Sequence, residues 1–341
     1  MKSNISKTDS RPGCESVLID ERSDRVCGLE KDKDVVLRDR GGAKVSILLV
    51  CYNARRFLEA CLNSVRESVT VPYEVILLDN GSSDGTREFV TEHFPWVRLI
   101  RSDENLGFIK GNNVAARSAR GKYYLLLNSD TVLMSDIKPA ICLLETDPRV
   151  GIVGAQMYGA HNERRPSTGH FPRAMLLWKF GWLWSSPEKH PYGNPGLKTF
   201  KVDWVEGSFL LTTAENWRAL GGLDEGNFFY GDDVEFCRNT ANHGLLTVQC
   251  ADVKYTHFGG YNVTRLAYLY AGFRRYHRKF SSLPERLLAD AVLRTGLFVR
   301  IGFFGARYLI TRDEELGEKY RRCLQVHKNW KQTDSFAPRF N

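Results

Sequence analysis

Short apolar runs alternate with segments of helical periodicity between residues 44 and 127, and this alternation limits the possible folds. The first run, Val45–Cys51, is almost continuously apolar and rich in branched side chains, as in a strand buried on both faces. Apolar residues recur at helical spacing over 56–67, and a second apolar run follows at 74–79. A strand, a helix and a strand in this order predict a βαβ unit with parallel strands.

The same pattern continues along the chain. Helical spacing over 85–92 precedes a strand-like run at 97–100, and helical spacing over 110–119 precedes another at 123–127. Repeated βα units predict an α/β, doubly wound fold with a mostly parallel sheet flanked by helices. In such sheets ligands bind where the strands end, so the residues that follow each apolar run are the candidate site residues.

Three of these strand ends are polar: 52–53, 79–85 and 128–130. Asp79 closes a strand, and Asn80 and a glycine turn follow it, which places a carboxylate and an amide where a nucleoside would need fixed acceptors. Asp84 either takes part in this site or caps the helix that begins near Thr86, while Asn80 and Gly81 form a turn.

Asp130 follows the strand at 123–127 and is predicted at the same sheet edge as Asp79. A divalent cation would find an oxygen ligand there, and Mg²⁺ or Mn²⁺ can stabilise the charge on a departing nucleoside diphosphate. The alternative is that Asp130 caps the turn that follows it.

Several segments occur in the order seen in family 2 glycosyltransferases, which this chain resembles. They are 45–53, 77–86, 105–108 with 111–113, and 125–131. The resemblance covers about 44–260 and implies the GT-A fold, which is Rossmann-like, here with a C-terminal helical extension. The family's acidic triplet reads Asn128-Ser129-Asp130, so its first acid is replaced, as in rhamnosyltransferase-like members.

The resemblance also implies site residues. The nucleotide-sugar donor would contact Tyr52, Asn53, Asp79, Asn80, Asn105, Gly107, Lys110, Asn128, Ser129 and Asp130. Asp130 would bind the metal, and His257 resembles a family histidine that completes the metal site. A single histidine can also be purely structural.

The segment 231–238 resembles another family motif, in which Asp233 occupies the position of the general base. Inverting transfer requires a carboxylate to remove the proton of the acceptor hydroxyl as it attacks the anomeric carbon. Asp232 and Glu235 exchange acid types relative to the motif. Asp232, Asp233 and Glu235 would also suit a helix N-terminus, and both interpretations can hold together.

The acceptor is expected to contact Trp204, Glu206 and Asp232. Trp204 and Glu206 resemble the family's acceptor-side loop, where an aromatic face stacks on a sugar and an acid accepts hydroxyl hydrogen bonds. Trp204 could equally belong to the core. The proline-rich and tryptophan-rich segment 158–201 is expected to form an acceptor-binding or membrane-facing loop.

Three regions are expected. Residues 1–42 lack periodicity and are predicted to form a disordered tail. Residues 43–262 are predicted to form the catalytic domain, and residues 263–341 a C-terminal helical segment.

The eight cysteines form no C-x-x-C pair, and Cys51, Cys61 and Cys142 lie in apolar runs, which predicts buried, reduced thiols. Residues 1–10 show no secretory signal, and no apolar stretch approaches about 20 residues, which predicts a cytoplasmic protein.

The formal net charge of +8 comes from 48 basic and 40 acidic residues, so no nucleic-acid partner is expected. The excess concentrates over 265–307, where arginines alternate with apolar residues. Helical spacing covers 270–280 and 289–310, and Arg294, Arg300 and Arg307 disfavour a membrane span. Association with the inner face of the cell membrane is one interpretation. Packing on the catalytic domain, or a homo-oligomer contact, is the other.

The predicted function is an inverting glycosyltransferase that uses a nucleotide-diphosphate sugar and a glycan or lipid-linked acceptor. Two alternatives stay open: a nucleotidyltransferase, although the chain has no G-x-x-x-x-G-K-[ST] phosphate loop, and a catalytically silent binding adaptor. Asp130 and Asp233 argue against the adaptor. A deoxysugar donor, rhamnose included, is suggested by the resemblance alone.

Overall fold

A computed structural model describes residues 42–175, 177, 198–226, 231–259 and 266–330. All of them belong to one compact unit of the chain, 37–341. The predicted tail, apart from Gly42, lies outside the described residues. So do the tryptophans at 178, 182 and 184 of the predicted acceptor loop, and the aromatic residues 228–230 directly before the segment 231–238.

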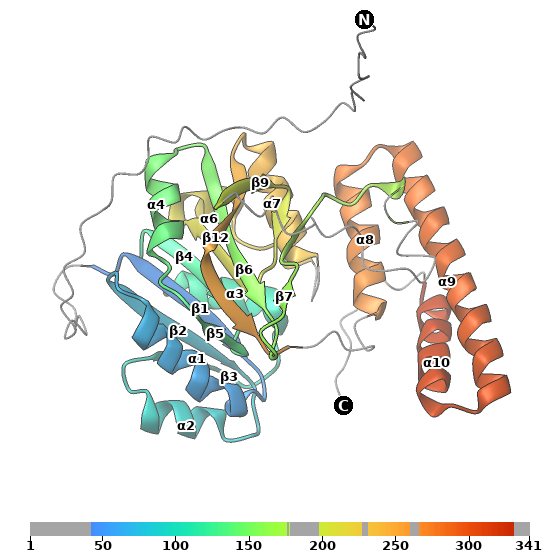
Figure 1. The fold of residues 1–341 in the computed structure, drawn as a ribbon, viewed down its shortest axis with the longest axis horizontal. Coiled ribbons are helices and arrows are strands. Elements are labelled where there is room, and N and C mark those ends of the chain that lie inside the picture. The colour runs from blue at the N-terminus through green and yellow to red at the C-terminus, as the bar shows by residue number, and fades with distance from the viewer. Residues whose placement is uncertain (1–41, 176, 178–197, 227–230, 260–265, 331–341) are drawn as a thin grey trace, which may run out of the picture. The chain divides into compact units, whose positions relative to one another are not determined.

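The first half of the chain folds as alternating strands and helices (Figure 1). Its elements are β1 (Val45–Cys51), α1 (Arg55–Ser68), β2 (Tyr73–Asn80), α2 (Thr86–His93), β3 (Arg98–Ser102), α3 (Gly107–Arg117) and β4 (Tyr123–Leu127). The predicted strands and helices of this region are confirmed: the ends of β1 and β4 match the predicted ones, and those of the other elements differ by one to three residues.

The second half contains more strands than the sequence pattern indicated. Its elements are β5 (Thr131–Leu133), α4 (Lys138–Thr146), β6 (Val150–Tyr158), β7 (Arg164–Arg165), β8 (Thr168–Gly169), β9 (Thr199–Val202), β10 (Trp204–Val205), β11 (Phe209–Thr213), α6 (Ala214–Leu220), α7 (Asp232–Asn242) and β12 (Leu246–His257). Three helices follow: α8 (Leu266–Phe280), α9 (Leu283–Thr311) and α10 (Glu314–Lys328).

One large sheet runs through the described residues in the order β3-β2-β1-β4-β11-β6-β12-β5, and β8 and β10 form a separate pair. The first four strands are parallel, as expected of βα repeats. The other half is mixed: β11 is antiparallel to β4 and to β6, whereas β12 is parallel to β6. The expected α/β class is therefore confirmed, with antiparallel pairs in one half of the sheet.

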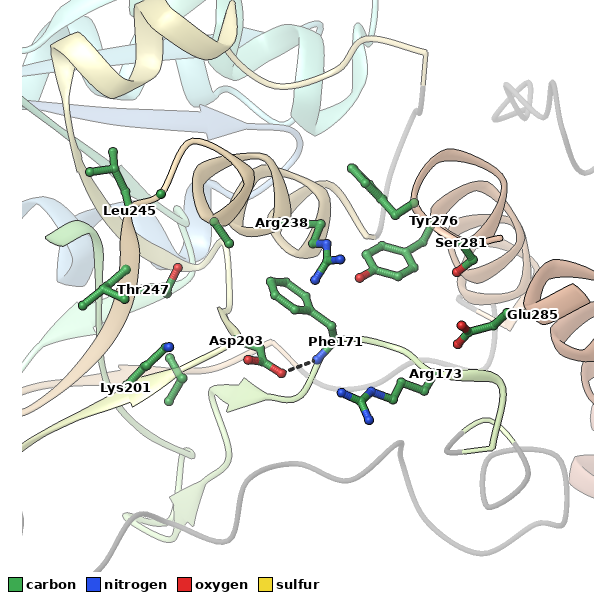
Figure 2. A pocket seen from close by; sticks show the side chains of 15 residues that line it. Phe171, Arg173, Lys201, Asp203, Arg238, Leu245, Thr247, Tyr276, Ser281 and Glu285 are labelled. Atoms are coloured by element: carbon green, nitrogen blue, oxygen red, sulfur yellow. Dashed lines mark hydrogen bonds between the residues drawn. The ribbon is translucent and has the colours of Figure 1, made fainter. Parts of the chain in front are cut away.

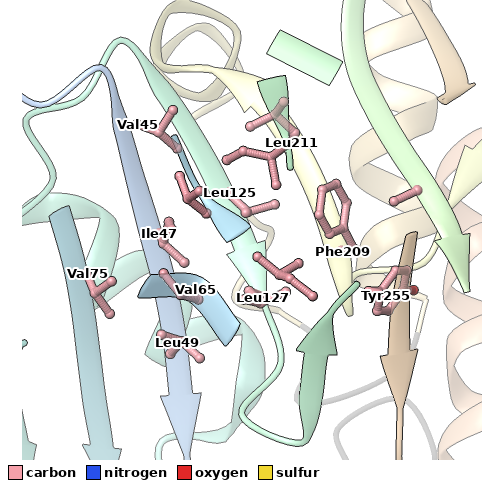
Figure 3. Close-up of a cluster of buried hydrophobic side chains, with 14 of the residues drawn as sticks. Val45, Ile47, Leu49, Val65, Val75, Leu125, Leu127, Phe209, Leu211 and Tyr255 are labelled. Atoms are coloured by element: carbon pink, nitrogen blue, oxygen red, sulfur yellow. The ribbon is translucent and has the colours of Figure 1, made fainter. Parts of the chain in front are cut away.

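Helices cover both faces of the sheet, which explains why β1 is apolar at successive positions. Ile47 and Leu49 point into the cluster that α1 and α4 cover (Figure 3). Leu48 points into the opposite cluster, where it packs with residues of α3, α6 and α7. A strand between two helical layers has no solvent face, so its sequence does not alternate.

The three C-terminal helices form a third apolar cluster. Tyr270 of α8, Leu293 of α9 and Cys323 of α10 are buried within it. The helix predicted from residue 289 begins earlier, at Leu283, because Ser282 at its N-cap is followed by a proline in the first turn. No helix in the described part of the chain combines the length and apolarity needed to cross a bilayer.

One expectation about the cysteines is wrong. Cys51 and Cys61 are buried as free thiols, but Cys142 is exposed. Helix α4 directs Ala140, Ile141 and Leu144 inward, and Cys142 falls on its outer face. An apolar neighbourhood in the sequence therefore does not ensure burial in a helix with one solvent face.

Candidate active site

The carboxyl ends of β1, β2 and β4 meet at one edge of the sheet. Cys51 is opposite Asp79 in the parallel register of β1 and β2, and β4 pairs with the other side of β1. The loops that follow these three strands carry most of the predicted donor residues. The topology therefore brings these loops to the end of the sheet where α/β proteins bind ligands.

The loops after β1 and β2 are joined by hydrogen bonds. The backbone N–H of Asn53 donates to Oγ of Ser82 at 3.0 Å, and the N–H of Ser83 donates to Oδ1 of Asn53 at 2.8 Å. Asn53 adopts a φ of 48°, a left-handed conformation that asparagine tolerates better than most residues. Tyr52, beside it, is 43% exposed. A cavity of about 530 Å³ lies here, lined by Asn53, Arg55, Arg56, Glu59, Asp84 and Phe89.

Asp79 is fully buried at the end of β2. Its carboxylate is paired with the guanidinium of Arg87, which also donates to the carbonyl oxygen of Ser102. Its other oxygen accepts a hydrogen bond from the N–H of Ser82 at 3.3 Å. Asp79 thus connects β2, the following turn and α2.

Asn80, Asn105 and Gly107 form a second connected group of predicted donor residues. The side-chain oxygen of Asn80 accepts from the N–H of Leu106 at 2.8 Å, and its amide donates to Oδ1 of Asn105 at 2.9 Å. Asn105 in turn accepts from the N–H of Gly107 at 2.9 Å. Gly107 has a φ of +80°, so this turn favours glycine. Lys110 is exposed one turn further along α3.

The geometry of Asp84 favours the structural interpretation. Its carboxylate accepts hydrogen bonds from the N–H of Thr86 at 3.2 Å and from the N–H of Arg55 at 3.0 Å. Burial raises its pKa, but the hydrogen bonds from Thr86 and Arg55 outweigh this effect and lower the pKa overall. Asp84 thereby ties the start of α2 to the start of α1.

Asp130 and His257 meet although they lie 127 positions apart. They meet because β5, which begins directly after Asp130, pairs antiparallel with the end of β12, with Thr131 opposite His257. Oδ1 of Asp130 lies 3.3 Å from Nε2 of His257, and the side-chain nitrogen of Asn128 lies 3.5 Å from that same ring nitrogen. Ser129 is buried between Asn128 and Asp130.

Gly259 passes close to this pair. A Cβ atom at this position would lie 2.6 Å from Oδ2 of Asp130 and 2.8 Å from Nε2 of His257. The backbone is held by Arg165, whose guanidinium donates to the carbonyl oxygens of His257 and Gly259 at 3.5 and 3.4 Å. A side chain at position 259 would therefore displace the carboxylate of Asp130 or the imidazole of His257 from its present position.

Asp233 lies in the first turn of α7. Oδ2 of Asp233 accepts a hydrogen bond from the N–H of Gly207 at 3.1 Å, and Oδ1 accepts from the N–H of Val234 at 2.8 Å. Burial, followed by the negative charge of Glu206, raises the pKa of Asp233 to about 6, against the lowering effect of these hydrogen bonds. A carboxylate with this pKa can accept a proton near neutral pH.

Gly207 connects the Asp233 region to the rest of the sheet edge. A Cβ at Gly207 would lie 3.5 Å from the Phe108 ring and 3.7 Å from Cβ of Asp233. Phe108 directly follows Gly107 of the predicted donor loop. The N–H of Asn128 donates to the carbonyl oxygen of Ser208, the residue after Gly207, at 3.2 Å. The loops that carry the predicted donor, metal and base residues are thus in mutual contact.

The predicted acceptor residues differ in their environment. Glu206 lies near Asp233, as its effect on the pKa of Asp233 indicates, and Asp232 is 9% exposed beside it. The indole N–H of Trp204 donates to the carbonyl oxygen of His170 at 2.9 Å, and its ring packs on the apolar cluster beneath α7. These contacts favour a core role for Trp204, the alternative stated above.

The sequence did not indicate the cations that hold the buried acids. Arg87 pairs with Asp79. In the sequence, Arg87 is only a basic residue in the first turn of α2, and this position does not indicate its partner. Glu235, which is 3% exposed, pairs with Arg275 at 3.0 Å and with Lys279 at 3.1 Å. These two cations lie 40 and 44 positions away on α8, beyond the reach of local patterns.

A cavity of about 590 Å³ lies apart from these residues. It is enclosed by β9, the second half of α7 and the facing ends of α8 and α9 (Figure 2). In it, the guanidinium of Arg238 lies 4.9 Å from the centre of the Phe171 ring, and Asp203 accepts a hydrogen bond from the N–H of Phe171 at 2.9 Å. None of the predicted site residues lines this cavity.

Comparison with protein families gives a match over residues 46–205 to the model described as Glycosyl transferase family 2. The chain is also similar to N-acetylglucosaminyl-diphospho-decaprenol L-rhamnosyltransferase from Mycobacterium tuberculosis. The two are 25% identical over 237 residues, which are 64% of this chain and 77% of the relative.

Two solved structures share the fold. The crystal structure of GalNAc-T7 with UDP, GalNAc and Mn²⁺ matches with a TM-score of 0.55 and 14% identity, over 70% of this chain and 48% of that chain. The mannosyltransferase PcManGT from Pyrobaculum calidifontis, in complex with GDP-Man and Mn²⁺, matches with a TM-score of 0.51 and 16% identity. The match covers 85% of this chain and 86% of that chain. At these identities the likeness concerns the fold, and the expected GT-A architecture with a C-terminal helical region is confirmed.

Proposed function

Because this chain is a glycosyltransferase with a family 2 domain over residues 46–205, we propose that it moves a deoxysugar, such as rhamnose, from a nucleoside diphosphate to an acceptor glycan, with inversion. Similarity to a rhamnosyltransferase whose named acceptor is N-acetylglucosaminyl-diphospho-decaprenol supports rhamnose and a lipid-linked acceptor. The donor would be a nucleotide sugar, and the product a cell-wall or surface polysaccharide.

One observation carries the proposal: loops from distant parts of the chain bring a carboxylate–imidazole pair and a carboxylate of raised pKa to the same sheet edge. Asn128 connects to Ser208, and Gly207 contacts Asp233. Donor, cation and base are the three components that sugar transfer from a diphosphate requires.

We assign the general base to Asp233. Its carboxylate would take the proton of the acceptor hydroxyl while that oxygen bonds to the anomeric carbon and the bond from that carbon to the diphosphate breaks. The pKa near 6 supports this role, because the carboxylate is ionised at neutral pH and still basic enough to share a proton. Glu206, next to Asp233, would bind acceptor hydroxyls.

Asp130 and His257 suit a divalent cation. A carboxylate oxygen and an imidazole nitrogen 3.3 Å apart are donors that Mn²⁺ accepts, and Mg²⁺ accepts the carboxylate. When bound, the cation would stabilise negative charge on the leaving diphosphate. Oxygens of the diphosphate and water would supply the remaining ligands.

The donor nucleotide would lie against the loops after β1, β2 and β3. Tyr52, Asn53 and Lys110 are partly or fully exposed there and are proposed to touch it. Asp79 is buried, so we propose that it supports the donor site by fixing the positions of Arg87 and Ser82. The enzyme would work in the cytoplasm, on the inner face of the cell membrane.

The test is release of nucleoside diphosphate by the purified protein from a panel of nucleotide sugars, with Mn²⁺ or Mg²⁺ and candidate acceptors. Asp233→Asn should lower turnover at least about 100-fold, because general base catalysis contributes about that much or more. The matched control is Asp252→Asn, an exposed carboxylate of β12. Full turnover by Asp233→Asn would remove Asp233 from the mechanism.

A further inference from the structure

Helix α9 has an exposed stripe without charged residues. The stripe follows helical spacing from Leu287 to Leu309, and every member is exposed. Its members are Leu287, Ala291, Thr295, Phe298, Gly302, Ala306 and Leu309. At 1.5 Å per residue the stripe is about 33 Å long. Its large side chains are far from buried: Leu287 is 62%, Phe298 54% and Leu309 65% exposed.

The stripe is not the face that holds the helical region together. Ala289, Leu293 and Leu297 point the other way, into the cluster shared with α8 and α10. Leu283, Leu288, Phe303 and Ile310 extend the exposed apolar area on the flanks of the stripe. Soluble proteins rarely expose a continuous apolar surface of this length, and such surfaces mark contact with a protein or a membrane.

Most of the net charge of the chain lies in the helical region 266–330, which includes this stripe. Residues 266–330 contain thirteen lysines and arginines and six aspartates and glutamates, a net charge of +7 out of +8 for the whole chain. Arg286 lies three residues after Leu283, Arg294 three residues after Ala291, and Arg307 four residues after Phe303, so each arginine neighbours an exposed apolar residue on the helix surface, and all three are exposed. Arginines along the borders of an apolar helix face are typical of helices that lie in a membrane interface.

We propose that the exposed face of α9 binds the surface of a bilayer that contains anionic lipids. Apolar side chains of the stripe enter the boundary between headgroups and acyl chains, and the bordering arginines contact anionic headgroups. A second copy of this chain is a poorer partner, because two helical regions of net positive charge would repel each other. Only the role of this membrane contact rests on the proposed function: it would keep the enzyme near a lipid-linked acceptor.

The test is co-sedimentation of the full chain with phosphatidylcholine vesicles, with and without phosphatidylglycerol. We expect binding to the anionic vesicles that weakens as salt is added. Leu287→Glu and Leu309→Glu should each weaken binding by about tenfold or more, because a charge then enters the apolar boundary. Arg286→Gln should weaken it about fivefold on anionic vesicles only.

The matched control is Gln325→Glu, which adds the same charge at an exposed position of α10. All variants change exposed side chains, so their melting temperatures should match that of the parent chain. Equal binding by Leu287→Glu, Leu309→Glu and the control would overturn the proposal. A dimer in the absence of vesicles that Leu287→Glu converts to monomer would overturn it too, in favour of self-association.

Release of nucleoside diphosphate with a water-soluble acceptor separates this proposal from the proposed function. Leu287→Glu should retain that activity and lose turnover of an acceptor embedded in vesicles. If the chain binds vesicles but is inactive on every donor, the membrane-binding proposal is supported and the proposed function is contradicted. If the chain is active but does not bind vesicles, the proposed function is supported and the membrane-binding proposal is contradicted.

Discussion

At the scale of single residues, the most informative side chain is Asp233. Desolvation raises its pKa, the charge of Glu206 raises it further, and the N–H groups of Gly207 and Val234 lower it, with a net value of about 6. A group that must be ionised to accept a proton loses activity as the pH falls through its pKa. The proposed transferase should therefore lose activity below about pH 6.

Glu206→Gln provides a direct test of this balance. Removing the negative charge of Glu206 should lower the pKa of Asp233 and move the acidic limb of the pH–rate profile to lower pH. The measurement is turnover against pH at saturating substrates. Glu215→Gln, which removes an exposed charge on α6, is the control and should leave the limb in place. If the acidic limb of the pH–rate profile stays in place in Glu206→Gln, a group other than Asp233 controls that limb.

At the scale of secondary-structure elements, α8 holds the helix that carries the proposed base. Glu235 of α7 is almost completely buried between Arg275 and Lys279 of α8, and both cations also pair with Asp224, at 2.8 and 2.6 Å. Burial raises the pKa of Asp224, but Lys279, the N–H of Gly226 and Arg275 lower it to about 2. This cluster of charges joins α8 to α7 and to the loop before it.

The double variant Arg275→Met and Lys279→Met should lower the free energy of unfolding by up to about 3–5 kcal/mol, because Glu235 would stay buried without a partner. Urea denaturation measures the change. The exposed pair on α10 is the control: Lys319→Met removes the partner of Glu315 and should cost at most about 0.5 kcal/mol. Adding Glu235→Gln to the double variant should restore part of the loss, and a further loss would contradict this account.

The sequence predicted well those strands and helices whose own residues show a clear apolar run or helical spacing. β1 and β2 are buried on both faces, so short apolar runs marked them. β8 and β10 are two residues long and exist only because they pair with each other, which no local pattern shows. Helix α10 was not predicted individually within the C-terminal helical segment, because seven of its 15 residues are charged, although Asp313 caps it by accepting hydrogen bonds from the N–H groups of Glu315 and Leu316.

The same limit applies to the candidate site. The order of strand-end residues indicated Asp130, and resemblance to a family suggested His257, but their contact depends on the pairing of β5 with β12. Arg87, Arg275 and Lys279 escaped prediction because a cation's partner is set by tertiary packing. Cys142 was misassigned because a nine-residue helix has an outer face even where its sequence is apolar.

At the scale of the whole molecule, the proposed donor site is distributed over loops that only the complete sheet brings together. Among the described residues, no group of three or more histidine, cysteine, aspartate or glutamate side chains is placed to hold a metal ion. Asp130 and His257 alone would bind a cation weakly, since Mg²⁺ and Mn²⁺ prefer more oxygen ligands. A nucleoside diphosphate should therefore complete the cation site, and each ligand should strengthen the binding of the other.

This coupling predicts how ligands change the stability of the chain. Mn²⁺ together with the correct nucleoside diphosphate, at about 100 times the dissociation constant, should add about 2.7 kcal/mol and raise the melting temperature by about 5 °C. Either ligand alone should raise it much less, because the site is then incomplete. Differential scanning fluorimetry with uridine, thymidine and guanosine diphosphates would measure this and would identify the base. His257→Ala should lose the part that depends on Mn²⁺, whereas His161→Ala, at an exposed loop position, should retain it. A full Mn²⁺-dependent rise in His257→Ala would mean that the cation binds elsewhere.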